Sequence, residues 1–297
     1  MKEDKLVTQQ VAEEQYQGHG TRKNLYLKLE KELGMPVISF FTSFRYPVML
    51  EDSDADMLEG VLQKSDLSNG FALLVSSPGG DGLAAERIIN ICRSYSGTQQ
   101  YKVIVPGKAK SAATMICLGG SELIMSKTSE LGPVDPQVVE VEDDKVKWFS
   151  VYNIVKSYDN LFKKAVKEKG NLQPYLQQLA NYDARVIEEY RSALSLSEDI
   201  AIKALKTGML SGLSETQIKK KINILLTPEK VKTHGRPIYA QDLLNCGLKV
   251  DIKDMTEPFW SMVYELYVRL NNYVSNHKVA KCIESKKWSF RAKVDVE

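Results

Sequence analysis

The sequence contains few of the residues that hold metals or form covalent cross-links. Its three histidines and four cysteines are scattered along the chain: His19, His234 and His277, and Cys92, Cys117, Cys246 and Cys282. No CxxC pair occurs and no histidine lies near a cysteine at zinc-finger spacing, so neither a structural metal nor a disulfide framework is indicated. We therefore expect reduced cysteines and no metal.

Long apolar runs and a large excess of one charge are also missing. No stretch approaches the roughly 20 apolar residues of a membrane-spanning helix. The opening residues MKEDKLVTQQVAEEQ carry charges where a secretory signal is apolar. Forty basic and thirty-eight acidic side chains leave a formal charge of +2, which creates no field that attracts nucleic acid or anionic membranes. These absences predict a cytoplasmic protein with no membrane span and no nucleic-acid partner.

The sequence does contain a regular alternation of apolar and amphipathic segments. Apolar segments of strand length begin at residues 37, 71, 101 and 122, and segments with helical spacing lie between them. Strands rich in Leu, Ile and Val that alternate with helices are typical of βαβ units around a mostly parallel sheet. We therefore predict an α/β fold, with the alternation running from about residue 37 to about residue 127.

The flanking segments have other patterns. Residues 1–36 predict an N-terminal helical extension, and residues 37–252 form the main domain. Within it, only helical patterns occur from Trp148 to Leu226, which predicts a helical insertion over 148–226. Residues 253–297 contain an amphipathic helix with an aromatic face at 258–274, followed by a tail that permits an edge strand.

Three short segments follow predicted strands, where open α/β sheets usually place their active sites. SSPGGDG at 76–82 combines a rigid proline with glycines, and suits either a tight turn or a set of N–H groups that bind an oxyanion. GKAKSAATM at 107–115 starts a helix at Ser111, which suits either a helix cap or a nucleophile. ELGPVDPQ at 130–137 holds Asp135 in a stiff loop, with a structural or a chemical role.

Together these segments resemble the serine dehydrogenase proteinase family of the ClpP/crotonase superfamily, which is related to signal peptide peptidase A type serine peptidases. That family has a [S/T]PGG turn after one strand, a serine with two small residues and a threonine after the next, and then an LGP[IV]DPQ loop. The matching segments are SPGG at 77–80, SAAT at 111–114 and LGPVDPQ at 131–137, with EDSDADMLEGVL and HGRPI at 234–238 also fitting. The resemblance covers roughly residues 37–252 and implies repeated ββα-type units with a mostly parallel sheet.

The resemblance also implies roles for four residues. Ser111 falls on the nucleophile position, and the N–H groups of Gly80 and Ala112 fall on the oxyanion-hole positions, with Gly79 supporting that turn. A serine hydroxyl needs a base within hydrogen-bond reach to become a nucleophile. ClpP-type enzymes take this base, a histidine, from the loop that matches LGPVDPQ, and this sequence has no histidine there.

Two kinds of residue remain as candidate bases. His234 lies near the position of the acidic member of the ClpP-type triad, and Asp135 lies near that of the histidine, so the two roles would be exchanged between loops. Alternatively a lysine is the base, as in signal peptide peptidase A type enzymes. The candidates are Lys110, Lys127, Lys156, Lys163 and Lys164. A catalytic lysine must be desolvated, whereas a lysine-rich helix is usually solvated, so we favour His234.

The sequence thus predicts an ATP-independent serine peptidase that cleaves peptide bonds through a Ser111 acyl-enzyme, acts on a peptide or protein and forms a homo-oligomer. One alternative is a crotonase-like acyl-CoA hydrolase or isomerase, which uses the same oxyanion turns without a serine nucleophile. The other is a catalytically silent scaffold or effector-binding protein of the same fold, because the loop histidine is missing.

Overall fold

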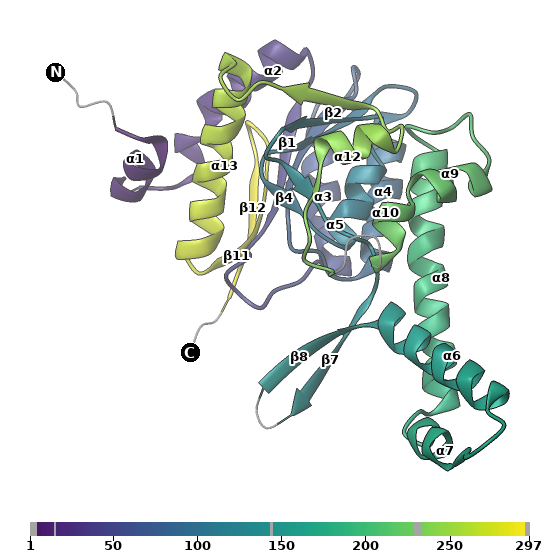
Figure 1. The fold of residues 1–297 in the computed structure, drawn as a ribbon. Helices are drawn as coiled ribbons and strands as arrows, with labels where there is room; N and C mark the ends of the chain where they lie inside the picture. Colours follow the sequence, from purple (N-terminus) through teal and green to yellow (C-terminus); the bar gives the residue numbers. More distant parts are fainter. Residues whose placement is uncertain (1–4, 15, 143–144, 229–232, 295–297) are drawn as a thin grey trace.

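The central element of the protein, in a computed structural model that describes residues 5–14, 16–142, 145–228 and 233–294, is a seven-stranded sheet (Figure 1). The strand order is β10-β5-β3-β2-β1-β11-β12, and the first five strands are parallel. The bounds are β1 Val37–Thr42, β2 Phe71–Ser76, β3 Tyr101–Val105, β5 Glu122–Ser126, β10 Val250–Lys253, β11 Val279–Glu284 and β12 Ser289–Lys293. The predicted α/β fold with a mostly parallel sheet is confirmed.

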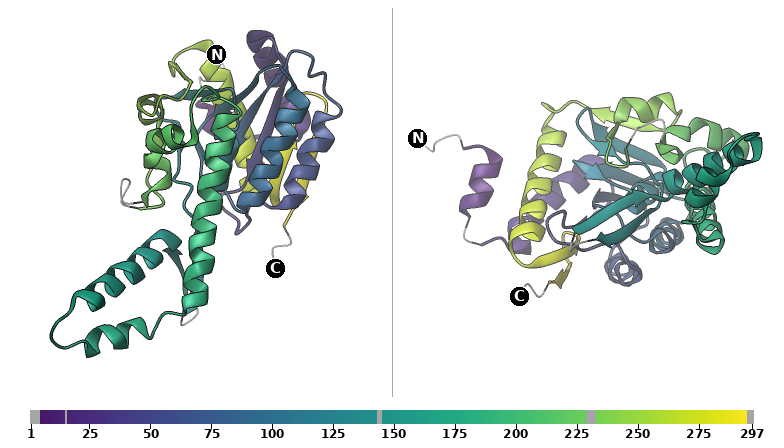
Figure 2. Two further views of the ribbon diagram at one scale, coloured as in Figure 1. Left: turned by 90° about the vertical axis from the view of Figure 1, so that its right-hand side faces the viewer. Right: turned by 60° about the horizontal axis from the view of Figure 1, so that its bottom comes forward.

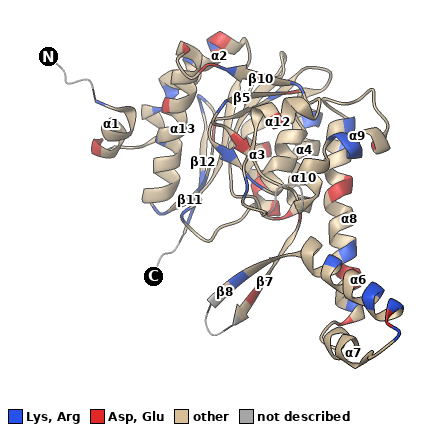
Figure 3. Cartoon of the chain, viewed as in Figure 1, with Lys and Arg blue, Asp and Glu red and all other residues tan. Residues whose placement is uncertain are grey.

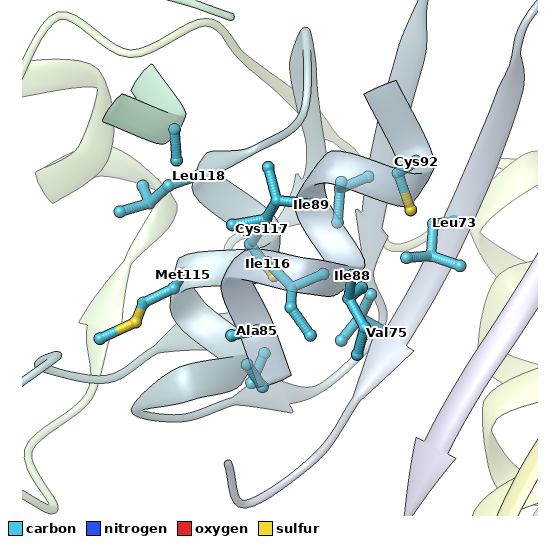
Figure 4. Packing of buried hydrophobic residues seen from close by; sticks show 14 of the residues in the cluster. Leu73, Val75, Ala85, Ile88, Ile89, Cys92, Met115, Ile116, Cys117 and Leu118 are labelled. Atoms are coloured by element: carbon cyan, nitrogen blue, oxygen red, sulfur yellow. The ribbon is translucent and has the colours of Figure 1, made fainter. Parts of the chain in front are cut away.

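Helices cover both faces of this sheet because successive strand side chains point to opposite sides. In β2, Leu73 and Val75 pack into the larger apolar cluster while Leu74 packs into the other. Figure 4 shows the first face, where side chains of α4 and α5 meet β2. The helices on that face are α3 Asp52–Leu62, α4 Gly82–Ser96 and α5 Ala112–Leu118, and those on the other are α2 Lys23–Leu33 and α13 Pro258–Asn276.

The terminal segments are part of this core. The N-terminal extension contains α1 Val7–Glu13 and a 3-10 turn at His19–Thr21 before α2. Near the other end of the chain, β11 pairs antiparallel with β1, and β12 is the predicted edge strand. A buried ion pair joins the two ends, because Arg22 Nε donates to Glu284 Oε2 at 2.8 Å. The tail therefore completes the sheet.

A ribbon and an arm project from the body (Figures 1 and 2). The ribbon is the antiparallel pair β7 Gln137–Glu142 and β8 Lys145–Ser150. The arm consists of α6 Val151–Lys167, α7 Gln173–Leu179 and α8 Ala184–Lys206, and α9 Glu215–Lys221 and α10 Asn223–Leu226 follow it. The prediction of helix only from Trp148 is wrong for residues 148–150, which belong to β8. The alternation in KVKWFS has the period of a strand.

A second, small sheet lies beside the large one. It has the order β4-β6-β9, with β4 at Lys108–Ala109, β6 at Glu130–Leu131 and β9 at Ile238–Tyr239. α12 at Ala240–Asn245 follows β9. Within the described ranges, no helix is both long and apolar enough to cross a bilayer. Figure 3 shows that acidic and basic residues occur on many of the same helices and strands.

Candidate active site

The small sheet brings together three segments that are distant in sequence. β4 is parallel to β6, so Ser111 after Ala109 and Asp135 after Leu131 leave the sheet at the same end. β9 is antiparallel to β6, with Ile238 opposite Leu131. His234 precedes Ile238 and therefore lies at that same end. Three two-residue strands thus gather the predicted site residues.

The backbone at Ser111 is strained. Ser111 has φ 50° and ψ −120°, and among the described residues only Lys278 shares a positive φ without being glycine. A non-glycine residue in this region costs energy and often marks a functional site. The cap alternative is wrong, because the Ser111 side chain makes no cap hydrogen bond to α5. Ser111 thus directly precedes α5, but its hydroxyl does not stabilise the free amides at the start of that helix.

The glycine turn packs directly against the serine. A Cβ on Gly79, where φ is 95°, would lie 2.4 Å from the Lys110 carbonyl oxygen and 2.9 Å from Ser111 Cβ. Only a glycine allows this approach. The Lys110 amide donates to the Ser77 carbonyl oxygen at 3.0 Å, which fixes the two segments side by side.

Two N–H groups at this contact are free to bind a ligand. Across the described part of the chain, the amides of Gly80 and Ala112 donate to no backbone or side-chain acceptor. Gly80 is held in place through Leu50, whose amide donates to the Gly79 carbonyl at 2.8 Å and whose carbonyl accepts from the Asp81 amide at 2.9 Å. Free N–H groups beside a serine can stabilise a developing oxyanion.

Thr114, in α5, links that helix to the LGPVDPQ loop. The Gly132 amide donates to Thr114 Oγ1 at 3.1 Å, and Thr114 Oγ1 is 3.0 Å from the carbonyl oxygens of both Ala109 and Gly132. One hydroxyl proton can serve either carbonyl. The LGPVDPQ loop is therefore held against α5 through a fully buried threonine.

Asp135 and His234 form a hydrogen-bonded pair. His234 Nδ1 lies 2.8 Å from Asp135 Oδ1, although the residues are 99 positions apart. The Asp135 side chain is fully buried and that of His234 is 19% exposed. The other carboxylate oxygen, Oδ2, accepts a hydrogen bond from Ser150 Oγ at 3.1 Å. A carboxylate in this position can fix the orientation and tautomer of an imidazole.

Ser150 is a residue that sequence reasoning missed. It ends β8, and its side chain accepts from the Asn153 amide as the N-cap of α6. The serine before the helical pattern VYNIV is a recognisable cap signal, but its second contact, to Asp135, has no sequence signature.

The serine and the imidazole are not hydrogen-bonded to each other. Within the described ranges, Ser111 Oγ and His234 Nε2 have no hydrogen-bond partner. In enzymes without bound substrate, the hydrogen bonds used in catalysis are often longer than in the substrate complex.

The candidate lysines lie in polar or open surroundings. Lys110 Nζ forms an ion pair with Glu130 at 2.7 Å, and its side chain is 15% exposed. The other four lysines are exposed: Lys127, Lys156, Lys163 and Lys164. None of these four has the burial that a catalytic lysine requires.

A pocket of about 320 Å³ adjoins Asp135. Its walls combine apolar residues such as Val134 and Leu226 with the charged Glu198 and Lys219. Among the described residues, no cluster of three or more His, Cys, Asp or Glu side chains could hold a metal ion.

One protein-family model matches part of the chain. Residues 30–170 match the model of the ClpP-like SDH-type serine proteinases. Over this segment the chain is similar to that family. The matched segment includes the glycine turn, Ser111 and Asp135, whereas His234 lies beyond it.

Similar proteins are known from Methanocaldococcus jannaschii. Uncharacterized protein MJ0137 is 28% identical over 234 residues, which are 79% of this chain and 68% of that protein. Uncharacterized protein MJ1495 is 33% identical over 106 residues, which are 36% of this chain and only 32% of that protein. A solved structure of a mutant 1510-N membrane-bound stomatin-specific protease in complex with a substrate peptide is also similar. It is 16% identical, with a TM-score of 0.29, and the match covers 74% of this chain and 93% of that chain.

Proposed function

We propose that the protein is a serine peptidase that cleaves peptide bonds in a peptide or protein through an acyl-enzyme on Ser111, without ATP or a cofactor. The observation that carries the proposal is the Asp135–His234 hydrogen bond of 2.8 Å at the same end of the small sheet as the strained serine. The match of residues 30–170 to the model of the ClpP-like SDH-type serine proteinases supports it.

The proposed reaction follows from these positions. His234 Nε2 takes the proton of Ser111 Oγ as the oxygen attacks the substrate carbonyl, while Asp135 stabilises the imidazolium through Nδ1. The N–H groups of Gly80 and Ala112 stabilise the tetrahedral oxyanion, and Gly79 keeps the turn close enough for this. His234 then protonates the leaving amine. His234 then takes a proton from water as the water attacks the acyl-enzyme, and it returns that proton to Ser111 Oγ as the ester bond breaks and the carboxylic acid product leaves.

Labelling with a fluorophosphonate tests this function. The probe phosphonylates activated serines and expels fluoride, so we expect one adduct per chain, mapped to the peptide that contains Ser111 by mass spectrometry. A crotonase-like acyl-CoA enzyme would turn over acyl-CoA without taking up the probe, and a silent scaffold would do neither. An unlabelled protein, or an adduct on another residue, contradicts the proposal.

We also propose that the protein is a homo-oligomer whose interface includes the ribbon. In the β7–β8 register, Val139 lies opposite Trp148 and Val141 opposite Val146. All four share one face of the ribbon and are 46% to 70% exposed. A two-stranded ribbon is marginally stable by itself, and a contiguous apolar face marks an interaction site. A second copy that covers this face removes it from water.

Replacing Trp148 with Glu tests this interface. A charge on the apolar face is expected to lower the molar mass measured by light scattering to that of the 33.5 kDa chain. Trp288→Glu is the matched control, because Trp288 is 49% exposed and lies between β11 and β12, away from the ribbon. Equal masses for both variants would place the interface elsewhere.

The cytoplasm is the proposed location. The four cysteines are buried and free, as is common in a reducing compartment.

A further inference from the structure

Ser150 connects the candidate site to the projecting part of the molecule. It is the last residue of β8 and the N-cap of α6, so it lies where the ribbon joins the arm. Its hydroxyl donates to Asp135 Oδ2 at 3.1 Å and accepts from the Asn153 amide at 3.4 Å. The Val151 amide also donates to the Pro136 carbonyl at 3.1 Å. The start of the arm is therefore bonded to the loop that carries Asp135.

The two oxygens of Asp135 have separate partners. Oδ1 contacts His234 and Oδ2 accepts from Ser150. Because the carboxylate is fully buried, water cannot replace a lost donor, and an unsatisfied buried oxygen is costly. The carboxylate is free to rotate about its terminal torsion. A donor on Oδ2 therefore keeps Oδ1 directed at the imidazole.

We propose that Ser150 is a positioning residue for the reaction: its hydroxyl holds the Asp135 carboxylate so that Asp135 orients His234, and it makes this orientation depend on the junction between ribbon and arm. The inference rests on the proposed function. It assigns Ser150 no contact with substrate. Displacement of the ribbon or the arm would move Ser150 and thereby weaken the activation of Ser111.

A pocket lies at the junction of the ribbon and the arm, and Ser150 borders it. It has a volume of about 670 Å³, and Ser150 forms part of its wall together with residues of the ribbon, α6 and α8, among them Trp148, Ile154 and Tyr190. A group that enters or leaves this pocket contacts the same residue that holds Asp135. Asp135 itself lines the smaller pocket, whose wall also includes Glu198 and Lys219, an ion pair at 2.5 Å.

The test must separate the two roles of the Ser150 hydroxyl. Threonine keeps both the cap and the donor, whereas glycine is a tolerated helix cap that has no donor. We expect Ser150→Thr to react with a fluorophosphonate at close to the wild-type rate. We expect Ser150→Gly to react roughly tenfold more slowly, the factor for one hydrogen bond to a charged group. The second-order rate constant of labelling measures this without a known substrate.

The pH profile of that rate is the second readout. Without the Ser150 donor the Asp135 carboxylate is held less firmly on Nδ1 and stabilises the imidazolium less, so the acidic limb of the Ser150→Gly profile is expected to move to lower pH. A residue that merely caps α6 would not move this limb. Ser157→Ala is the matched control, because Ser157 also lies in α6 but contacts Tyr182 at 3.2 Å and not Asp135. It should keep the wild-type rate and profile.

The outcomes distinguish this inference from the proposed function. If the wild-type protein takes up no label at Ser111, both fail together. If the wild type is labelled and Ser150→Gly matches Ser150→Thr in rate and pH profile, Ser150 is only a cap and the inference alone is overturned. Thermal unfolding of both variants shows whether a loss of rate comes from a loss of folded protein.

Discussion

Replacing Ser111 with Ala is expected to reduce peptide hydrolysis by a factor on the order of 10⁵ to 10⁶, the loss that follows removal of a triad nucleophile. The fold should be unaffected. Across the described part of the chain the Ser111 hydroxyl makes no hydrogen bond and does not cap α5, so the substitution removes no stabilising contact. Alanine also adopts the observed φ of 50° at about the same cost as serine, since both carry a Cβ.

Release of dye from a quenched, fluorescently labelled unfolded protein is a suitable measurement. Ser94→Ala is the matched control, because Ser94 is exposed on α4, away from the small sheet. It should keep full activity. Hydrolysis by Ser111→Ala at more than a few per cent of the wild-type rate would show that Ser111 is not the nucleophile.

Replacing Asp135 with Asn is expected to lower the rate of hydrolysis by roughly 10³- to 10⁴-fold while the protein stays folded. The amide has the size of the buried carboxylate and still accepts from Ser150. If its NH₂ group faces Nδ1 of His234, that nitrogen must act as the acceptor, and Nε2 then carries the proton. An imidazole in this tautomer cannot take the proton of Ser111.

His234→Ala should cause a loss of similar size, because members of a triad act as a unit. Variants with methionine in place of the exposed Lys127, Lys156 or Lys163 distinguish a lysine base from a histidine base. We expect these variants to hydrolyse the substrate at nearly the wild-type rate. A large loss in one lysine variant, with little effect of His234→Ala, would exchange the proposed base for that lysine. The rates of hydrolysis and of fluorophosphonate labelling should rank these variants in the same order.

Much of the fold could be predicted from local patterns. The apolar segments beginning at residues 37, 71, 101 and 122 are strands of the main sheet, and the amphipathic segments between them are helices. Each strand is buried on both faces, so its sequence is almost continuously apolar. The position of Ser111 beside Gly79 could also be predicted, because a glycine turn and a serine helix after adjacent parallel strands meet at one edge of the sheet.

The sequence by itself determined the parallel core, the glycine turn and the serine at the start of α5, because these depend on residues close together along the chain. Only the tertiary structure decided that His234 meets Asp135 and that Ser150 holds the other carboxylate oxygen. The strands that gather them, β4, β6 and β9, have two residues each, too few for a periodic pattern. Their pairing arises from backbone hydrogen bonds between distant segments, which side-chain sequence does not encode locally.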